Sequence, residues 1–257
     1  MRAKLLALGM SLLAMALVGA ACGGEDDGGD ETATTGTGST TTTAAANSPT
    51  ARASASPITV GEAVARLKAF EPAAELVDGQ ALGRKDSKVV LGAFEDFQCP
   101  VCLSFTLLNE NVIMEEYVKT GKIRFEFLHM PILGAESANA AIGGVCAAQQ
   151  NKFWPYHKKL FVVQAEAGQL SDEKLNIGRF SPENLKKYVG EAGLDATAFE
   201  ACLKSDAAAA EATAQLRQAR DLGVRGTPTF VLNGKVLSPT PPDAAAWRKV
   251  LDEALAK

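Results

Sequence analysis

Residues 94–102 read Phe-Glu-Asp-Phe-Gln-Cys-Pro-Val-Cys, and the sequence pattern changes at the two cysteines. The apolar run before them, Lys88–Phe94, is short and contains adjacent valines, so it predicts a buried strand. After Cys102, apolar residues recur at helical spacing as far as Gly121. The cysteines therefore lie where a strand passes into the first turn of a helix. Pro100 suits that turn, because the N–H that proline lacks would be unpaired there anyway.

This placement gives the two thiols different chemistry. Side chains three positions apart share one face of a helix, close enough here for a disulfide. Cys99, at the very start, meets unpaired N–H groups and the positive end of the helix dipole, and both favour a thiolate. Cys102 lies one turn deeper, with less water and a weaker field. We therefore predict that Cys99 attacks a substrate and that Cys102 resolves the resulting mixed disulfide.

A structural thiol pair and half of a zinc site are the alternatives for these cysteines. Zinc normally takes four ligands from cysteine and histidine, and the chain has no second Cys-x-x-Cys motif. The succession of strand, motif and helix favours redox chemistry. We therefore expect no metal, and no cofactor other than the redox-active disulfide Cys99–Cys102 itself.

Three stretches of the chain, in the order found here, resemble the DsbA-like branch of the thioredoxin superfamily. They are Phe97–Cys102, an alanine-rich helix predicted over Ser137–Phe161, and Gly223–Val231 with its Thr-Pro pair. The resemblance extends from about Lys88 to the C-terminus. It implies an α/β thioredoxin fold with a helical insertion, at about residues 134–205, between its β-α-β part and its C-terminal α-β-β-α part. It also implies thiol–disulfide exchange on exported proteins.

The resemblance further implies how the site is completed. Pro228 would form a cis peptide bond with Thr227 and face Cys99, whereas an ordinary turn proline would be trans. A cis bond would leave the Thr227 N–H and C=O free to pair with an extended substrate strand. Pro100 and Val101 would belong to the same surface. Reoxidation in the family is done by a membrane redox partner, either quinone-linked and DsbB-like or similar to vitamin K epoxide reductase.

Two positions depart from the family pattern. Val101 stands where the most oxidising relatives carry histidine, and it offers the thiolate no hydrogen bond or charge, so we predict an intermediate reduction potential. Ala93 stands six positions before the first cysteine, where relatives often have a buried acid that accepts a proton from the resolving thiol. Glu95 and Asp96 are expected to be solvated charges at the strand end, which leaves the proton of Cys102 to water.

Two further cysteines, Cys146 and Cys202, lie in the predicted insertion. Exported proteins meet oxidants, so we expect these two to form a structural disulfide. Closing the long loop between them would stabilise the fold by about 3–4 kcal/mol. The alternative, a relay of electrons to Cys99, has no supporting motif. His129 and His157 are expected to pack at a strand end and a helix seam, with His129 as an alternative general base.

Residues 1–22 have the pattern of an export signal. Arg2 and Lys4 precede the apolar run Leu5–Val18, and small residues lead to Cys22. The segment resembles a bacterial lipoprotein signal, in which the cysteine is acylated and becomes the mature N-terminus. Ordinary cleavage nearby, leaving a free thiol, is the alternative. We therefore expect an exported protein, anchored by lipid on the outer face of the cytoplasmic membrane or in the periplasm.

The rest of the chain divides by composition. Residues 23–56 are mostly Gly, Thr, Ala and Ser and predict a disordered tether, since they carry too little apolar surface to fold. Residues 57–87 predict a lead-in helix and a hairpin, and 88–257 the DsbA-like domain. Within that domain we also expect strands at 122–128, 229–232 and 235–237 and helices at 206–222 and 243–255.

The charge of the chain bears on its partners. The formal net charge is −4, and lysine and arginine are scattered, which argues against a nucleic-acid partner. The expected partners are exported proteins that contain thiols or disulfides. Two other functions stay open, namely a reductase or isomerase of the same fold, and a non-catalytic module that grips extended peptides at Thr227-Pro228.

Overall fold

The structure is a computed structural model that describes residues 58–257. The predicted signal segment 1–22, its lipid-attachment residue Cys22 and the predicted tether 23–56 lie outside the described residues. No helix within 58–257 is long and apolar enough to span a bilayer. The same part of the chain contains no cluster of three or more Cys, His, Asp or Glu side chains placed to hold a metal.

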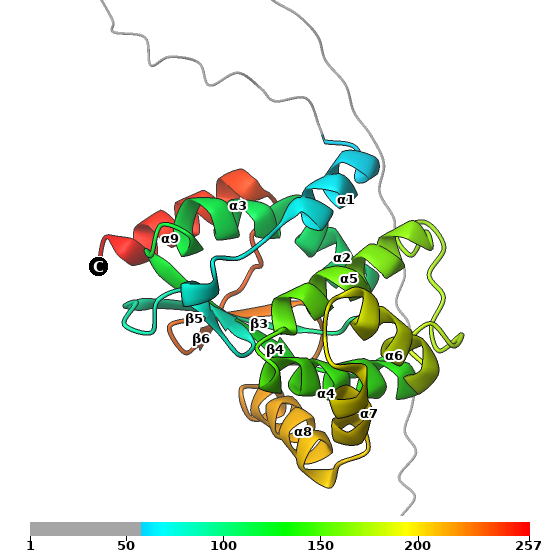
Figure 1. Cartoon of the computed structure of the whole chain (residues 1–257). Helices are drawn as coiled ribbons and strands as arrows, with labels where there is room; N and C mark the ends of the chain where they lie inside the picture. Colours follow the sequence, from blue (N-terminus) through cyan, green and yellow to red (C-terminus); the bar gives the residue numbers. More distant parts are fainter. Residues whose placement is uncertain (1–57) are drawn as a thin grey trace, which may run out of the picture. The chain divides into compact units, whose positions relative to one another are not determined.

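A six-stranded sheet lies at the centre of the described chain (Figure 1), in the order β1-β2-β4-β3-β5-β6. Its strands are β1 (Val77–Asp78), β2 (Ala81–Leu82), β3 (Val89–Glu95), β4 (Ile123–His129), β5 (Thr229–Leu232) and β6 (Lys235–Val236). Only β3 and β4 pair in parallel, because a helix connects them; the other neighbours are antiparallel. The register sets Glu95, the last residue of β3, opposite His129, the last of β4.

One helical stretch connects β3 to β4, as the sequence predicts, but it is not a regular α-helix. Its parts are α2 (Pro100–Phe105), η2 (Thr106–Glu110), α3 (Asn111–Ile113) and η3 (Met114–Val118), of which η2 and η3 are π-helical. The C-terminal helix α9 (Ala244–Leu255) lies beside α3 (Figure 1). Phe230 of β5 packs between Phe105 and Trp247, with ring centroids 4.6 and 4.7 Å away, and so joins α2 and α9 to the sheet.

Helices fill the segment between β4 and β5. They are α4 (Ala135–Gln149), α5 (Phe153–Glu166), α6 (Pro182–Glu191), α7 (Ala196–Leu203) and α8 (Asp206–Asp221). The single helix predicted over 137–161 is wrong, because Asn151 adopts a left-handed conformation with φ 54° and separates α4 from α5. Gly144 lets α4 approach the sheet, since a Cβ there would lie 2.3 Å from Cε1 of His129.

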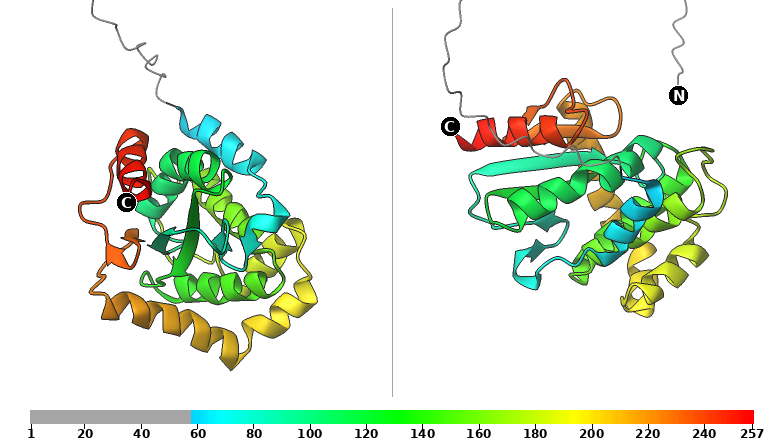
Figure 2. Two further views of the ribbon diagram at one scale, coloured as in Figure 1. Left: turned by 90° about the vertical axis from the view of Figure 1, so that its left-hand side faces the viewer. Right: turned by 90° about the horizontal axis from the view of Figure 1, so that it is seen from above.

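The two faces of the sheet bury different partners. Leu91, Ala93 and Glu95 of β3 share one face, and the first two belong to the same core cluster as residues of the cysteine-bearing helix and α5. On the other face Phe94 packs with Val224, before β5, and with Ala219 of α8. Figure 2 shows α8 running beside α4, with which it is in contact.

A short N-terminal region completes the domain. Thr59 caps α1 (Val60–Ala69), and it forms a capping box with Glu62. This helix packs on α5 and η2, and the turn η1 (Ala74–Leu76) leads from it into β1. The predicted lead-in helix and ribbon therefore join the same sheet as the rest of the domain.

Candidate active site

The strand-to-helix junction places Cys99 at the N-cap of α2. Its sulfur accepts a hydrogen bond from the backbone N–H of Cys102 at 3.5 Å, and Pro100 occupies the first helical turn. Both thiols are free. Cys99 keeps 6% of its surface exposed, whereas Cys102 is fully buried. A reagent can therefore reach the first sulfur but not the second.

The surroundings shift the pKa values of the two thiols in opposite directions. Hydrogen bonds from the Cys102 thiol, from the Thr227 side chain and from backbone N–H groups lower the pKa of Cys99 to about 6, although burial opposes them. Burial raises the pKa of Cys102 well above its usual range, and its hydrogen bond to Cys99 and the charge of Glu95 add to the effect. At neutral pH Cys99 is thus mainly a thiolate, while Cys102 keeps its proton.

The loop before β5 faces the exposed sulfur. The peptide bond between Thr227 and Pro228 is cis, and the Cys99 thiol donates a hydrogen bond to the Thr227 carbonyl oxygen at 3.4 Å. The Thr227 carbonyl therefore meets the thiol when Cys99 is protonated. A second cis bond, Ser238–Pro239, was not predicted and lies beyond β6.

Val101 marks the surface beside Cys99. Its side chain is 59% exposed, whereas Pro100 is half-buried. The Val101 side chain carries no polar group, but its backbone N–H is one of the donors that lower the pKa of Cys99. The residue therefore supplies an apolar surface and a backbone dipole, and no side-chain charge, next to the reactive sulfur.

Asp96 is buried, which contradicts the prediction of a solvated charge. Its Oδ2 accepts hydrogen bonds from the N–H groups of Ile132 and Leu133 at 2.8 and 3.1 Å. Its Oδ1 accepts from the Ser137 hydroxyl at 2.6 Å and from the Gln98 N–H at 2.9 Å. Burial raises the pKa of Asp96, although these hydrogen bonds oppose it. Asp96 therefore ties the turn before Cys99 to the start of the helical insertion.

Gln98 makes a second connection to the insertion. Its side-chain amide donates to Ser137 Oγ at 2.9 Å and accepts from the Asn176 N–H at 2.8 Å. The backbone carbonyl of Gln98 accepts from the Gln169 side chain at 3.0 Å. These contacts are long-range in sequence, so the sequence pattern gave no signal for them. They fix the backbone that presents Cys99.

Glu95 also contradicts the expectation of a solvated charge, since only 1% of it is exposed. It lies two positions after Ala93 on the same face of β3, and so points toward the buried side of α2. This two-residue strand period was the available sequence signal. Burial raises the pKa of Glu95 well above its usual range, and the charge of Glu110 raises it further. Glu110 itself was not singled out from the sequence.

The two histidines lie in an aromatic region behind the site. Both are almost completely buried, among Phe97, Phe127 and Phe153. Burial lowers the pKa of His129 and of His157 to about 3 each, so both are neutral. Packing is therefore the role that their surroundings favour.

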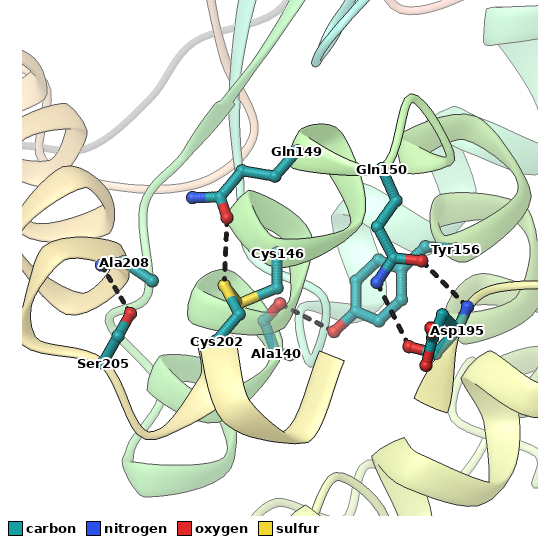
Figure 3. Close-up of a disulfide and its surroundings, with 9 residues drawn as sticks. All are labelled: Ala140, Cys146, Gln149, Gln150, Tyr156, Asp195, Cys202, Ser205 and Ala208. Carbon is teal, nitrogen blue, oxygen red and sulfur yellow. Dashed lines mark hydrogen bonds between the residues drawn. A yellow bond between two sulfur atoms is a disulfide. The ribbon is translucent and has the colours of Figure 1, made fainter. Parts of the chain in front are cut away.

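Cys146 and Cys202 form a disulfide that joins α4 to α7 (Figure 3). Gln149, also on α4, lies 3.4 Å from the sulfur of Cys202. Tyr156 of α5 donates to the Ala140 carbonyl of α4 at 2.8 Å in the same region. The structure thus places this pair between helices of the insertion, apart from the junction that carries Cys99 and Cys102.

Comparisons with known proteins agree with this arrangement. Residues 75–253 match the family described as Thioredoxin. Disulfide bond formation protein D of Bacillus subtilis is 28% identical over 171 residues, which cover 63% of this chain and 71% of that protein. Probable disulfide bond formation protein D of Bacillus cereus is 28% identical over 183 residues, covering 69% and 79%.

A crystal structure supports the same fold. Oxidised BdbD from Bacillus subtilis matches with a TM-score of 0.61 at 20% identity, over 73% of this chain and 97% of that one. The α/β thioredoxin fold expected from the sequence is therefore confirmed.

Proposed function

Because the chain belongs to the DsbA-like branch of the thioredoxin superfamily and is a thiol–disulfide oxidoreductase, we propose that it forms or exchanges disulfides in exported proteins through Cys99 and Cys102. One observation carries this proposal. The pKa of Cys99 is lowered to about 6 while that of Cys102, three positions on, is raised well above its usual range. A structural thiol pair needs no such difference between its sulfurs.

The oxidative half of the cycle starts with a disulfide between Cys99 and Cys102. A substrate thiolate attacks the Cys99 sulfur, the bond between the two cysteines breaks, and Cys102 leaves and takes up a proton. A second substrate thiolate then attacks the substrate sulfur of the mixed disulfide. Cys99 leaves as a thiolate, and its low pKa makes it a good leaving group. The substrate gains a disulfide, and the enzyme is left with two thiols.

Thr227 and Pro228 are the proposed substrate contacts. The Thr227 carbonyl accepts the Cys99 thiol proton in the reduced, protonated site. When Cys99 is oxidised or ionised it has no proton to donate, so this carbonyl becomes available to an extended substrate chain. Pro100 and Val101 would border the same contact surface, with the exposed Val101 side chain as an apolar neighbour.

The cycle needs an external oxidant. We propose a membrane redox partner, quinone-linked and DsbB-like or related to vitamin K epoxide reductase, that takes two electrons from the reduced pair. The proposed location is outside the cytoplasmic membrane, with Cys22 as lipid attachment point and residues 23–56 as a tether. The apolar run Leu5–Val18 ahead of Cys22 supports the location.

The proposal is tested with the full chain and a reduced, unfolded protein substrate whose activity returns only when its disulfides form. We expect the oxidised chain to restore that activity and Cys99→Ser to lose it, because the sulfur that forms the mixed disulfide is absent. If Cys99→Ser were as active as the wild type, the proposal would be wrong. If both proteins bound unfolded peptides equally and neither changed thiols, the chain would be a peptide-binding module.

A further inference from the structure

Every turn of the proposed cycle moves one proton to or from Cys102, yet this sulfur is completely buried. Position 93, six before the first cysteine, holds alanine and carries no titratable group. The proton must therefore reach Cys102 through some other side chain. This inference rests on the proposed function, and it concerns where that proton goes.

Glu95 is the acid that faces Cys102. Its charge raises the pKa of the Cys102 thiol, and the thiol in turn favours the ionised carboxylate. Neither Glu95 oxygen, however, has a hydrogen bond of good geometry among the described residues. Ionising a buried carboxylate that lacks partners destabilises the folded protein. A buried carboxyl group without hydrogen-bond partners, such as that of Glu95, is therefore a candidate for a functional role.

A second buried acid, Glu110, lies near Glu95. It comes from the π-helical turn η2 on the cysteine-bearing helix, and its Oε2 is 3.6 Å from Nε2 of His157. Its charge raises the pKa of Glu95, so the two carboxyl groups share one region. Burial raises the pKa of Glu110 to about 8. Two like charges in so buried a region cannot both ionise readily, so the pair holds a proton at neutral pH.

Glu110 also lines a cavity. Together with Thr106 it lines a small cavity of about 10 Å³ beneath α1, whose other walls include Ala63, Arg66 and Leu67. That volume is about the room that a single water molecule needs. Thr106 is buried, with no well-formed hydrogen bond to its hydroxyl, and lies beside the Glu110 carboxyl. Arg66, which also lines the cavity, is exposed.

We propose that Glu95 and Glu110 form a proton route between Cys102 and the cavity beneath α1. When a mixed disulfide at Cys99 is resolved, Cys102 gives its proton to Glu95, and its sulfur attacks the Cys99 sulfur. The bond between Cys99 and the substrate breaks, the new disulfide forms, and the substrate leaves as a thiolate. Glu110 releases the proton that the pair already holds to water in the cavity, and the proton from Glu95 then replaces it on Glu110. In the oxidising direction the same proton moves inward.

The other charged and titratable groups near this route do not replace it. His157 on α5 and His129 on β4 have pKa values of about 3, so both rings are uncharged at neutral pH and take up no additional proton. Cys99, the N-cap of α2, is the reacting partner, and Arg66 on α1 lines the cavity. Glu95 is the acid next to the resolving thiol, whereas Glu110 acts through Glu95 and is a relay residue.

The test follows the two sulfurs separately. The full chain is reduced and mixed rapidly with excess 5,5′-dithiobis(2-nitrobenzoate), and release of the coloured thiol is followed from pH 5 to pH 9. Attack by Cys99 gives the first phase, and resolution by Cys102 gives the second. Cys99→Ser supplies the baseline for any other reactive thiol. The variants are Glu110→Gln, Glu110→Asp, Thr106→Val and, as a matched control on the same helical stretch, Glu115→Gln.

We expect Glu110→Gln to slow the second phase at least about tenfold at pH 7, with the first phase unchanged. The loss should shrink as the pH rises, because hydroxide then removes the proton directly. Glu110→Asp should recover part of the rate, and Thr106→Val should slow the second phase less. The second phase of the wild type should be slower in deuterated water. Glu115→Gln, whose carboxylate pairs with Lys119 at the surface, should behave as wild type.

Two results overturn the route. One is a second phase in Glu110→Gln with the wild-type rate and pH profile. The other, decisive also if Glu110→Gln fails to fold, is a wild-type rate in Thr106→Val together with no isotope effect in the wild type. Failure of the proposed function would look different, since the wild type itself would then lack a fast first phase.

Discussion

Cys99 and Cys102 lie three positions apart at the start of α2, whereas Cys146 and Cys202 lie 56 positions apart and join α4 to α7. Burial does not separate the two pairs, because Cys99 and Cys146 are both largely inaccessible. What differs is the set of groups that each sulfur meets. Cys99 receives hydrogen bonds from a helix N-terminus and from Thr227, while Cys146 and Cys202 meet each other between packed helices. Local dipoles, not depth, decide which pair reacts.

Cys102→Ser should cause the largest loss of activity, and this loss would distinguish the catalytic cysteine pair from the structural one. The Cys99 sulfur can still attack a disulfide, but nothing can release the mixed disulfide, so turnover should fall at least about a thousandfold. A covalent enzyme–substrate complex should accumulate and be visible on a non-reducing gel. Rapid turnover without a trapped complex would show that Cys102 is not the resolving thiol.

The double change Cys146→Ser with Cys202→Ser should act on stability instead. Loss of the 56-residue crosslink frees the unfolded chain, and loop entropy puts the cost at about 4 kcal/mol. Urea unfolding measures it. The rate of thiol exchange at 25 °C should stay close to wild type, since neither sulfur contacts Cys99. A large loss of exchange in a fully folded double variant would make this pair part of the redox path.

A smaller effect is expected from Val101→His. A histidine beside the Cys99 thiolate adds a donor that valine lacks, which stabilises the reduced enzyme and makes it a stronger oxidant. Titration against a glutathione buffer should show a reduction potential higher by about 30 mV or more, equivalent to a tenfold change in the equilibrium constant. Val101→Leu is the apolar control and should leave the potential near the intermediate wild-type value. A wild-type potential at either extreme of the family would contradict the expectation.

The last expected effect is a pH dependence of stability that only the catalytic pair should give. The pKa of Cys99 falls from 9.0 as a free thiol to about 6 in the folded protein, so the folded state binds fewer protons between these values. The resulting stability is fully present above about pH 9 and is lost as the pH falls through 6. The unfolding free energy of the reduced protein, minus that of the oxidised protein, should therefore rise from pH 6 to pH 9. Cys99→Ser should remove that slope.

The sequence predicted those structural features that depend on residues close together in the chain. The strand before Cys99, the helix after it and the hairpin at Asp78-Gly79 follow from local spacing and turn residues. The fold class followed from three motifs in order, and the family match bears it out. The roles of Cys99 and Cys102 stay predictions, although the structure supplies the electrostatic difference that they need.

What the sequence could not predict depends on distant segments. Asp96 is buried because Ile132, Leu133 and Ser137 supply its hydrogen bonds from about 36 to 41 positions away. Glu110 is buried on a π-helical stretch that no residue pattern predicted.

The most direct test of the central claim is the ionisation of Cys99 in the reduced full chain. The rate of alkylation by iodoacetamide, measured from pH 4 to pH 10 with Cys99→Ser subtracted, reports the thiolate fraction of this sulfur. We predict a rate that rises through a single ionisation near pH 6 and is constant above about pH 8. A midpoint near 8.5–9, as in a free cysteine, would contradict the account.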